Sequence, residues 1–385
     1  MDKINILFIS SLPTRKLINS SERKIDSFYR SSAYLIEGLR LIPEVNIKVI
    51  TSPDIKSFPH NKAYYKRMYD EIDDITMVSS LNISYVKQLW TIISMVVEGI
   101  KHIRNSKDVT YVIIPYMVFR HVMASRILKL ICGKKMKGCI VIPDIFFPQN
   151  KIFKLVNKYT EKLACKNDFF ILYTKAMGDY LKIQDKPYIV IEGFKKVDSL
   201  PIHSKDDKFI IMYAGSLTIK YGILRLVDAM NFISEKDIEL HLYGDGDGVN
   251  DIIEASKNDD RIKYFGKVSK DEATKALYKS SVLVNPRSAD DGEYVAYSFP
   301  SKDIDYLATG IPSILCKLPG MPQNYYGKFI DAGNGTSKEI AECVMKVYKM
   351  TEEERLDFGK NAFDFIKQQM NPVDQANRII KMFEK

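Results

Sequence analysis

The chain has 385 residues, of which 46% are hydrophobic and 27% are charged. This length predicts two domains, and the composition excludes a globally disordered protein. No apolar run approaches the roughly 20 residues that a membrane-spanning helix needs, and the first residues indicate a strand, not a secretion signal. The five cysteines follow no zinc or disulfide spacing, which favours a reducing, cytoplasmic location.

Positive charge is concentrated in the first half of the sequence. Residues 1–200 contain 32 Lys and Arg against 19 Asp and Glu, a net +13, and the remainder has 25 against 29, a net −4. This asymmetry favours an anionic partner such as phosphate or lipid headgroups, with a merely solvated surface as the alternative. We expect no nucleic acid, because no base-stacking module is visible.

Apolar runs typical of buried strands alternate with helical patterns along the whole chain. In the first half, strands are expected at residues 4–9, 45–50, 111–114, 139–142, 169–173 and 189–192, and helices at 31–41 and 86–104. In the second half, strands are expected at 209–213, 238–243, 262–265, 281–285 and 313–316, and helices at 222–234, 269–278, 301–309 and from 338, with Pro372 breaking the last one. This alternation predicts an α/β protein with parallel sheets.

A polar, aperiodic stretch at residues 195–207 separates the two series of elements. We therefore expect one doubly wound domain over residues 1–200 and a second over 201–365. The helical tail, residues 366–385, is expected to cross back to the first domain.

Glycines follow two of the expected strands in the second half. Gly215 and Ser216 come after the first strand, and Gly244 and Gly246 come after the next. A glycine at a strand end lets a ligand approach the backbone closely, although a simple tight turn is the alternative.

The segment that follows Phe299 has the composition of a diphosphate site. Pro300 keeps the chain extended, Ser301 is expected to cap the helix at 301–309, and Lys302 adds a positive charge near the free amides of its first turn. Asp305 lies one turn further on and could accept hydrogen bonds from a ribose diol. The alternative is that Asp305 pairs with Lys302 within the helix.

The ordered motifs YAGSL, HLYGDGDG, VLVNPR and SFPSKDIDYLATGIP resemble the nucleotide-binding half of the family 4 retaining glycosyltransferases, in their capsule and exopolysaccharide branch. The resemblance covers roughly residues 208–330. It implies a GT-B fold, in which two Rossmann-like doubly wound domains face each other across a cleft. The first domain would bind the acceptor and the second the nucleotide-sugar donor. Outside the α/β plan, the first half resembles the family only in Val141-Ile142-Pro143-Asp144.

The resemblance also implies roles for carboxylates. Asp305 occupies the position of the glutamate that holds the ribose. The family's other glutamate would fall on Tyr297, so Glu293 is expected to be the carboxylate that faces the sugar. A solvated loop acid is the alternative for Glu293. Asp144 is expected to orient an acceptor hydroxyl, with a helix-cap or turn acid as its alternative.

Basic residues depart from the family pattern. The family's Arg and Lys positions hold Ser216 and Tyr221 here, so Lys220, one residue away, is expected to neutralise the leaving diphosphate together with Lys302. Lys267 is expected to lie beside the base. In the first half, His121 is a candidate cleft residue, and a phosphate-bearing acceptor could bind the basic residues after the first strand, which are Arg15, Arg23, Lys24 and Arg30.

The resemblance therefore implies a retaining hexosyltransferase that moves a sugar from a nucleoside-diphosphate sugar to a glycan or lipid-linked acceptor during cell-surface polysaccharide synthesis. Neither a cofactor nor a metal is expected, although Asp245 and Asp247 have the spacing of a DxD metal motif. The alternatives are a catalytically inactive GT-B subunit that binds a partner and a nucleotide-sugar epimerase.

The first half also suggests docking on the inner face of the membrane. The helix at 86–104 combines an apolar stripe with basic residues, and Lys134, Lys135 and Lys137 form a second basic cluster. The alternative is that Trp90, Ile93 and Val97 are core residues of the first domain.

Overall fold

The computed structural model describes residues 3–12, 27–52, 55–72, 74–201 and 207–384. The chain forms two compact units, which we call unit 1 (Met1–Phe194 with Asn371–Lys385) and unit 2 (Lys195–Met370). The division predicted at residue 200 lies just beyond the change of unit after Phe194. Among the described residues, no helix is long and apolar enough to cross a bilayer.

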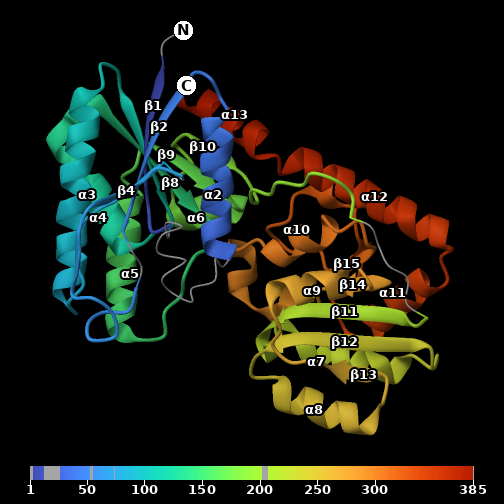
Figure 1. Cartoon of the computed structure of the whole chain (residues 1–385). Helices are drawn as coiled ribbons and strands as arrows, with labels where there is room; N and C mark the ends of the chain where they lie inside the picture. Colours follow the sequence, from blue (N-terminus) through green and yellow to red (C-terminus); the bar gives the residue numbers. More distant parts are fainter. Residues whose placement is uncertain (1–2, 13–26, 53–54, 73, 202–206, 385) are drawn as a thin grey trace. The chain divides into compact units, whose positions relative to one another are not determined.

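Unit 1 is built on an eight-stranded sheet of order β10-β9-β8-β7-β1-β2-β5-β4, parallel except for the β4–β5 pair (Figure 1). The strands of this sheet are β1 (Ile4–Ser10), β2 (Val45–Thr51), β4 (Met68–Asp70), β5 (Ile75–Met77), β7 (Thr110–Pro115), β8 (Met136–Ile142), β9 (Phe169–Leu172) and β10 (Tyr188–Val190). A separate short pair joins β3 (Tyr64–Tyr65) to β6 (Ser80–Leu81). The apolar runs of the sequence therefore form the buried centre of this unit.

Helices cover both faces of this sheet (Figure 1). One face carries α3 (Val86–Asn105), α4 (Phe119–Cys132) and α5 (Lys151–Ala164), and the other carries α2 (Ser27–Arg40) and α13 (Pro372–Phe383), while α6 (Lys175–Leu181) packs on β9. The tail of the chain is thus part of unit 1, where the Phe383 ring stacks on Tyr111 at 4.2 Å between centroids. The helical tail is broken at Pro372, as the sequence predicted: α12 (Glu352–Gln369) ends just before it, and Pro372 occupies the first turn of α13, where a missing N–H costs nothing.

Unit 2 has a six-stranded parallel sheet of order β13-β12-β11-β14-β15-β16. Its strands are β11 (Phe209–Ser216), β12 (Ile238–Asp245), β13 (Ile262–Tyr264), β14 (Val282–Val284), β15 (Ser313–Leu315) and β16 (Ile330–Asp331). Its helices are α7 (Ile223–Ala229), α8 (Val249–Asn258), α9 (Lys270–Leu277), α10 (Ser301–Leu307), α11 (Ser337–Tyr348) and α12 (Glu352–Gln369).

The strand order of each sheet identifies where a ligand is expected. In unit 1 the chain turns from β1 to β2 on one side and later to β7 on the other. In unit 2 the corresponding strand is β11, which pairs with β12 on one side and with β14 on the other. In doubly wound sheets, ligands bind at the carboxyl ends of the strands at this switch point.

The sequence prediction and the structure differ mainly in the helices, because α4, α5, α6 and α8 were not predicted and the ends of others differ. The capping box of Ser269 and Glu272 at the start of α9 is confirmed. The helix predicted at 222–234 ends as α7 at Ala229 and continues as a single 3₁₀ turn, Met230–Phe232.

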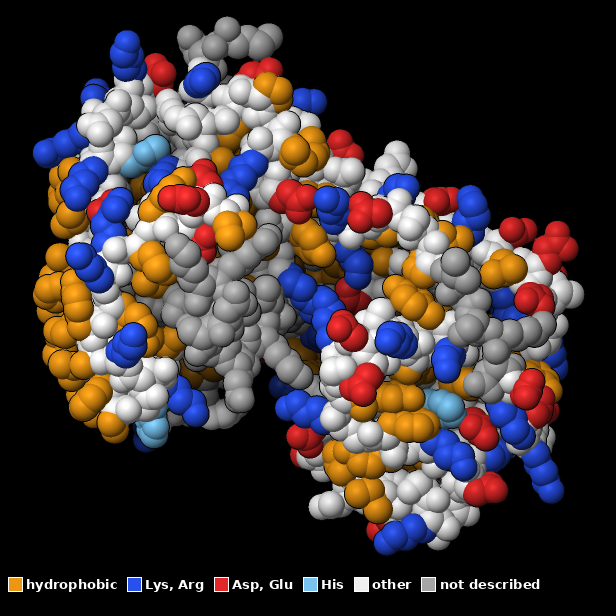
Figure 2. Space-filling view, viewed as in Figure 1, with side chains coloured by type: hydrophobic (Ala, Val, Ile, Leu, Met, Phe, Trp, Pro, Cys, Tyr) orange, Lys and Arg blue, Asp and Glu red, His pale blue; other side chains and the backbone are white. Residues whose placement is uncertain are grey.

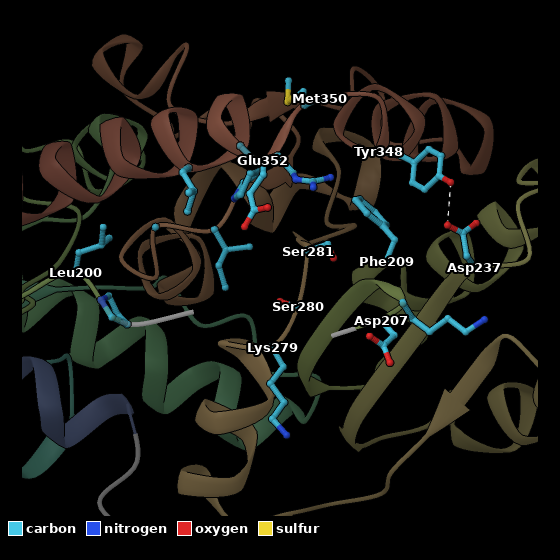
Figure 3. A pocket seen from close by; sticks show the side chains of 17 residues that line it. Leu200, Asp207, Phe209, Asp237, Lys279, Ser280, Ser281, Tyr348, Met350 and Glu352 are labelled. Atoms are coloured by element: carbon cyan, nitrogen blue, oxygen red, sulfur yellow. Dashed lines mark hydrogen bonds between the residues drawn. The ribbon is translucent and has the colours of Figure 1, made fainter. Parts of the chain in front are cut away.

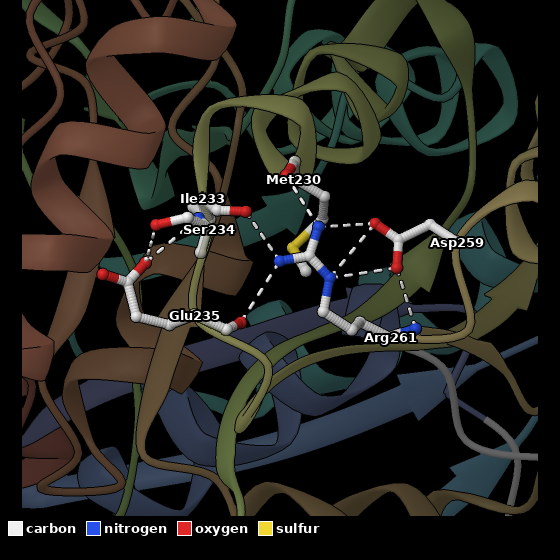
Figure 4. Close-up of polar contacts among 6 residues, drawn as sticks. All are labelled: Met230, Ile233, Ser234, Glu235, Asp259 and Arg261. Atoms are coloured by element: carbon white, nitrogen blue, oxygen red, sulfur yellow. Dashed lines mark hydrogen bonds and ion pairs between the residues drawn. The ribbon is translucent and has the colours of Figure 1, made fainter.

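A half-buried arginine stabilises this turn against the next strand (Figure 4). The Arg261 guanidinium donates to the carbonyl oxygens of Met230 (3.0 Å), Ile233 (2.6 Å) and Glu235 (3.2 Å), and it pairs with Asp259 at 2.6 Å. Since Arg261 lies one residue before β13, it joins the end of the α7 segment to the edge of the sheet.

Candidate functional site

The carboxyl end of β11 holds a lysine ammonium in a restricted space. Lys302 Nζ donates a hydrogen bond to the Ala214 carbonyl and lies 4.1 Å from the centroid of the Tyr213 ring. A Cβ on Gly215 would lie 1.8 Å from Lys302 Nζ, and the φ of Gly215 is +152°. Gly215 is therefore required for the position of the Lys302 ammonium.

Burial changes the ionisation of two neighbouring residues on α10. It lowers the pKa of Lys302 to about 8, because the ammonium is withdrawn from water beside the Tyr213 ring. It raises the pKa of the buried Asp303 carboxyl to about 6, although Asn285 donates a hydrogen bond to it at 2.6 Å. The result is a weakly held proton on Lys302 at the switch point.

Two further cations lie against aromatic rings nearby in unit 2. Lys220 Nζ is 3.8 Å from the centroid of the Tyr294 ring, and the Arg287 guanidinium is 5.1 Å from the same ring. Arg287 also lies 5.7 Å from the ring of Tyr221, and it donates a hydrogen bond to the Ser298 hydroxyl. Arg287 Nε is buried without a partner among the described atoms. Lys220, Arg287 and Lys302, which we call the cation cluster, therefore present positive charge around the carboxyl ends of β11 and β14.

The predicted glycines are explained by close backbone contacts. A Cβ on Gly244 would lie 1.7 Å from the Gly215 carbonyl oxygen, and one on Gly246 would lie 2.4 Å from that of Leu217. Both glycines let the ends of β11 and β12 approach each other. Their contact with a ligand stays a prediction.

Two predictions about α10 need correction. Ser301 does not cap the helix: Pro300 is the N-cap residue and no side chain makes a cap hydrogen bond, because Ser301 is already the first helical residue. Asp305 does not pair with Lys302, whose ammonium points toward β11. It forms an ion pair with Lys195 instead. A ribose diol at Asp305 would compete with that lysine.

The other predicted residues of unit 2 lie at the surface. Glu293 is exposed, and its carboxylate accepts a hydrogen bond from the Tyr297 hydroxyl at 3.4 Å. The exposed Ser216 hydroxyl lies 2.6 Å from that of Thr218. Lys267 is also exposed, and it follows Phe265, whose ring stacks on Tyr243 at 4.5 Å between centroids. This aromatic pair is a surface that sequence reasoning missed, because its members are far apart in the chain.

Polar residues also meet at the switch point of unit 1. The Ser11 hydroxyl, just after β1, lies 3.1 Å from His121 Nε2 and accepts a hydrogen bond from Arg120 at 2.7 Å. Burial, followed by the nearby Arg120 charge, lowers the pKa of His121 to about 3, so the imidazole is neutral at pH 7. Ser11 was not predicted, since a serine after a strand carries no local signal.

Asp144, the predicted acceptor residue, is exposed just after β8. The neighbouring strand, β9, ends beside Tyr173, whose hydroxyl lies 2.5 Å from that of Ser31. Burial raises the pKa of Tyr173 to about 12, so this phenol stays protonated. Of the basic residues predicted to hold an acceptor phosphate, Arg15, Arg23 and Lys24 lie outside the described residues.

A pocket of about 600 Å³ in unit 2 lies elsewhere (Figure 3). Phe209 and Ser281, at the amino ends of β11 and β14, line it together with Tyr348, Glu352 and Arg355. It contains none of the predicted site residues. The pocket is therefore at the opposite edge of the sheet from the cation cluster.

Known proteins resemble this chain in one segment of sequence and in overall structure. Residues 208–350 match the family model described as "Glycosyl transferases group 1". No curated protein matches the chain in sequence.

Three solved structures illustrate the structural likeness. Anabaena Alr3699/HepE in complex with UDP has a TM-score of 0.67 at 13% identity, covering 99% of this chain and 100% of that chain. TarM of S. aureus has a TM-score of 0.67 at 12% identity, covering 100% and 99%. Sucrose-phosphate synthase from Thermosynechococcus elongatus has a TM-score of 0.65 at 12% identity, covering 99% and 98%. The chain has the two-domain, Rossmann-like GT-B fold, as predicted, and the family match supports a glycosyltransferase.

Proposed function

We propose that the protein transfers a sugar from a nucleoside-diphosphate sugar to a glycan or lipid-linked acceptor, with retention at the anomeric carbon, in the cytoplasm and as a step of cell-surface polysaccharide synthesis. The glycosyltransferase match over residues 208–350 supports the reaction class. Retention and the polysaccharide role rest on the resemblance of the SFPSK segment to family 4 enzymes.

The observation that carries this proposal is the cation cluster at the switch point of unit 2. When the bond between the anomeric carbon and the diphosphate breaks, negative charge develops on the departing phosphate oxygens. Lys302 lies at the end of β11, and Lys220 and Arg287 lie on the rings around β14. Cations fixed before the reaction stabilise that charge without reorganising during it.

The other predicted residues take roles that fit their places. Asp305 would bind the ribose hydroxyls in place of its present ion-pair partner, Lys195. Lys267 would lie beside the base. Glu293 would bind sugar hydroxyls through its exposed carboxylate, in place of its long hydrogen bond from Tyr297. In unit 1, Asp144 would orient the acceptor hydroxyl.

The direct test is a thermal-shift panel of nucleoside diphosphates and their sugars, beginning with UDP and UDP-glucose, followed by release of the sugar from whichever donor binds. A ligand that binds the folded state at a hundredfold excess over Kd adds about 2.7 kcal/mol to the free energy of unfolding, and Tm rises as a result. We expect a rise for one nucleoside diphosphate and slow sugar release. No rise with any member of the panel would contradict the proposal.

We also predict that the reaction needs no divalent metal. Asp245 and Asp247 each accept a backbone hydrogen bond at 2.9 Å, from Gly246 and Ile219, and so organise the glycine-rich loop. The cation cluster would supply the charge that a metal supplies elsewhere. Sugar release in EDTA should equal that in the untreated protein. Loss of activity that manganese restores would show that the two carboxylates bind a metal.

One observation favours a second candidate, a binding subunit without activity. The positions of the family's Arg and Lys hold Ser216 and Tyr221, and Lys220 lies on a tyrosine ring. Nucleoside diphosphate binding without sugar release from any donor would support this candidate over the transferase.

A further inference from the structure

Helix α5 of unit 1 turns its apolar side outward. Its exposed residues include Ile152 (74% exposed), Leu155 (71%) and Phe153 (65%). Its buried residues are Thr160 and Ala164. A surface helix of a globular protein has the opposite polarity, with its apolar stripe packed on the core.

The inward side of α5 is held in place by polar contacts. Asn157 donates hydrogen bonds to Glu161 at 2.7 Å and to the Phe146 carbonyl at 3.0 Å. The Thr160 hydroxyl donates to the Val156 carbonyl at 2.8 Å. Rolling the helix to bury its apolar side would expose Ala164 and break the contact with Phe146. These contacts therefore fix the orientation of α5, with its apolar side exposed to solvent.

Helix α3 adds a second exposed apolar stripe. Leu89 is 61% exposed, Ile93 51%, Val97 45% and Trp90 38%. The alternative that these residues are core residues is wrong, because α3 packs through its other side, which carries Met95 and Ile103. Figure 2 shows hydrophobic side chains gathered along the outer edge of unit 1, over this helix.

Both stripes lie on the same side of the unit 1 sheet. Helices α3 and α5 pack on either side of α4, and each leads into a parallel strand of the sheet. The first turns of both helices therefore lie toward the carboxyl ends of the strands, the edge that carries Ser11 and Asp144. Exposed apolar patches on a protein surface indicate an interaction site.

A line of lysines borders the apolar side of α5. Lys151, Lys154, Lys158 and Lys162 are all exposed, and their spacing of three and four residues aligns them along one side of the helix. The single acid of α5, Glu161, is half-buried on the inner side. An apolar face bordered by lysines is complementary to a bilayer with anionic headgroups.

We propose that the outward faces of α3 and α5, which we call the lipid face, insert into the headgroup region of an anionic bilayer. A second copy of the chain fits this face less well, because a two-fold contact through α5 would bring the two lysine lines together. The lipid face lies wholly in unit 1, so it does not depend on the donor reaction proposed for unit 2.

The chain provides its own reporter, because Trp90, its single tryptophan, lies in the lipid face. The experiment measures Trp90 emission and co-sedimentation with vesicles of phosphatidylcholine, with and without phosphatidylglycerol. We expect a blue shift and binding on the vesicles that contain phosphatidylglycerol. Salt should weaken this binding without abolishing it, since burial of apolar side chains is not screened.

Two variants separate insertion from charge attraction. Ile152→Glu with Leu155→Glu should lower the partition onto anionic vesicles at least ~tenfold, because two large apolar side chains no longer enter the lipid. Lys154→Gln with Lys158→Gln should weaken binding mainly at low salt. Leu41→Glu is the control: Leu41 is also a large exposed apolar residue, at 61% exposed, but follows α2 on the other side of the sheet.

Three outcomes would overturn the proposal. These are equal binding to both kinds of vesicle, no binding at low salt, and unchanged binding of the α5 glutamate variant. A blue shift that grows with protein concentration in the absence of vesicles would show instead that a second copy covers this face. Nucleoside diphosphate affinity, measured on the same variants, should not change, which confirms that they are folded and distinguishes this proposal from the donor site.

Discussion

Lys302→Ala should weaken nucleoside diphosphate binding by roughly 1.5–3 kcal/mol, the range for a hydrogen bond to a charged group. This corresponds to about a tenfold to a hundredfold increase in Kd. The reason is that Lys302 Nζ lies at the end of β11, where Gly215 leaves it room to approach the departing phosphate. Isothermal titration calorimetry measures the change, and an unchanged Kd would remove Lys302 from the site.

The same lysine predicts a pH dependence. Burial lowers the pKa of Lys302 to about 8 in the free protein, and a bound anion would raise it, so binding takes up a proton above that pH. Affinity should therefore be full below the pKa and fall as the pH rises through it. Lys302→Ala should lose this pH response. Lys220→Ala, at an exposed cation, should weaken binding but keep the response, and a pH response that survives in Lys302→Ala would contradict the assignment.

Arg261→Ala should lower the free energy of unfolding by roughly 3 kcal/mol, because it leaves three backbone carbonyls and a carboxylate without their donor. The Arg261 side chain is only 17% exposed, so water replaces few of these hydrogen bonds. Its hydrogen bonds also lower the pKa of Asp259. The stabilisation is thus present at neutral pH and is lost as the pH falls through the lowered pKa of the folded protein. Urea unfolding at neutral and acidic pH measures both effects.

The control for this prediction is Lys360→Ala. Lys360 pairs with Asp364 at 2.8 Å on the exposed side of α12, where both side chains are more than half exposed. Water solvates both charges when the pair is broken, so the free energy of unfolding should hardly change. Equal losses for Lys360→Ala and Arg261→Ala would show that the burial of Arg261 does not matter.

Sequence patterns predicted the strands better than the helix ends. Nearly continuous apolar runs such as that of β11 can only be buried on both faces, and so they identify a parallel sheet. The end of α10 was less predictable, because Ser301 has the residue type of a cap while Pro300 takes that position. The choice depends on how the chain enters the helix, which residue type alone does not specify.

Part of the candidate site could also be predicted. Lys302 and the glycines were identified because their motif is contiguous and follows strands. The sequence placed Arg287 at the end of a strand but gave it no role, since its importance depends on the rings of Tyr221 and Tyr294, which come from separate loops. The partner of Asp305 was also missed, because Lys195 is more than a hundred residues earlier in the chain.

The sequence by itself determined the α/β class through its periodicity, and its contiguous motifs pointed to the GT-B plan through their resemblance to glycosyltransferases, because both are local properties of the chain. Only the tertiary structure decided which side of each helix is buried. The stripe of Trp90, Ile93 and Val97 has the spacing of a core face, yet it is exposed because the opposite side of α3 is equally apolar and packs on the unit. Periodicity shows that a helix has an apolar side, but only packing against neighbouring elements shows whether that side meets the core or the solvent.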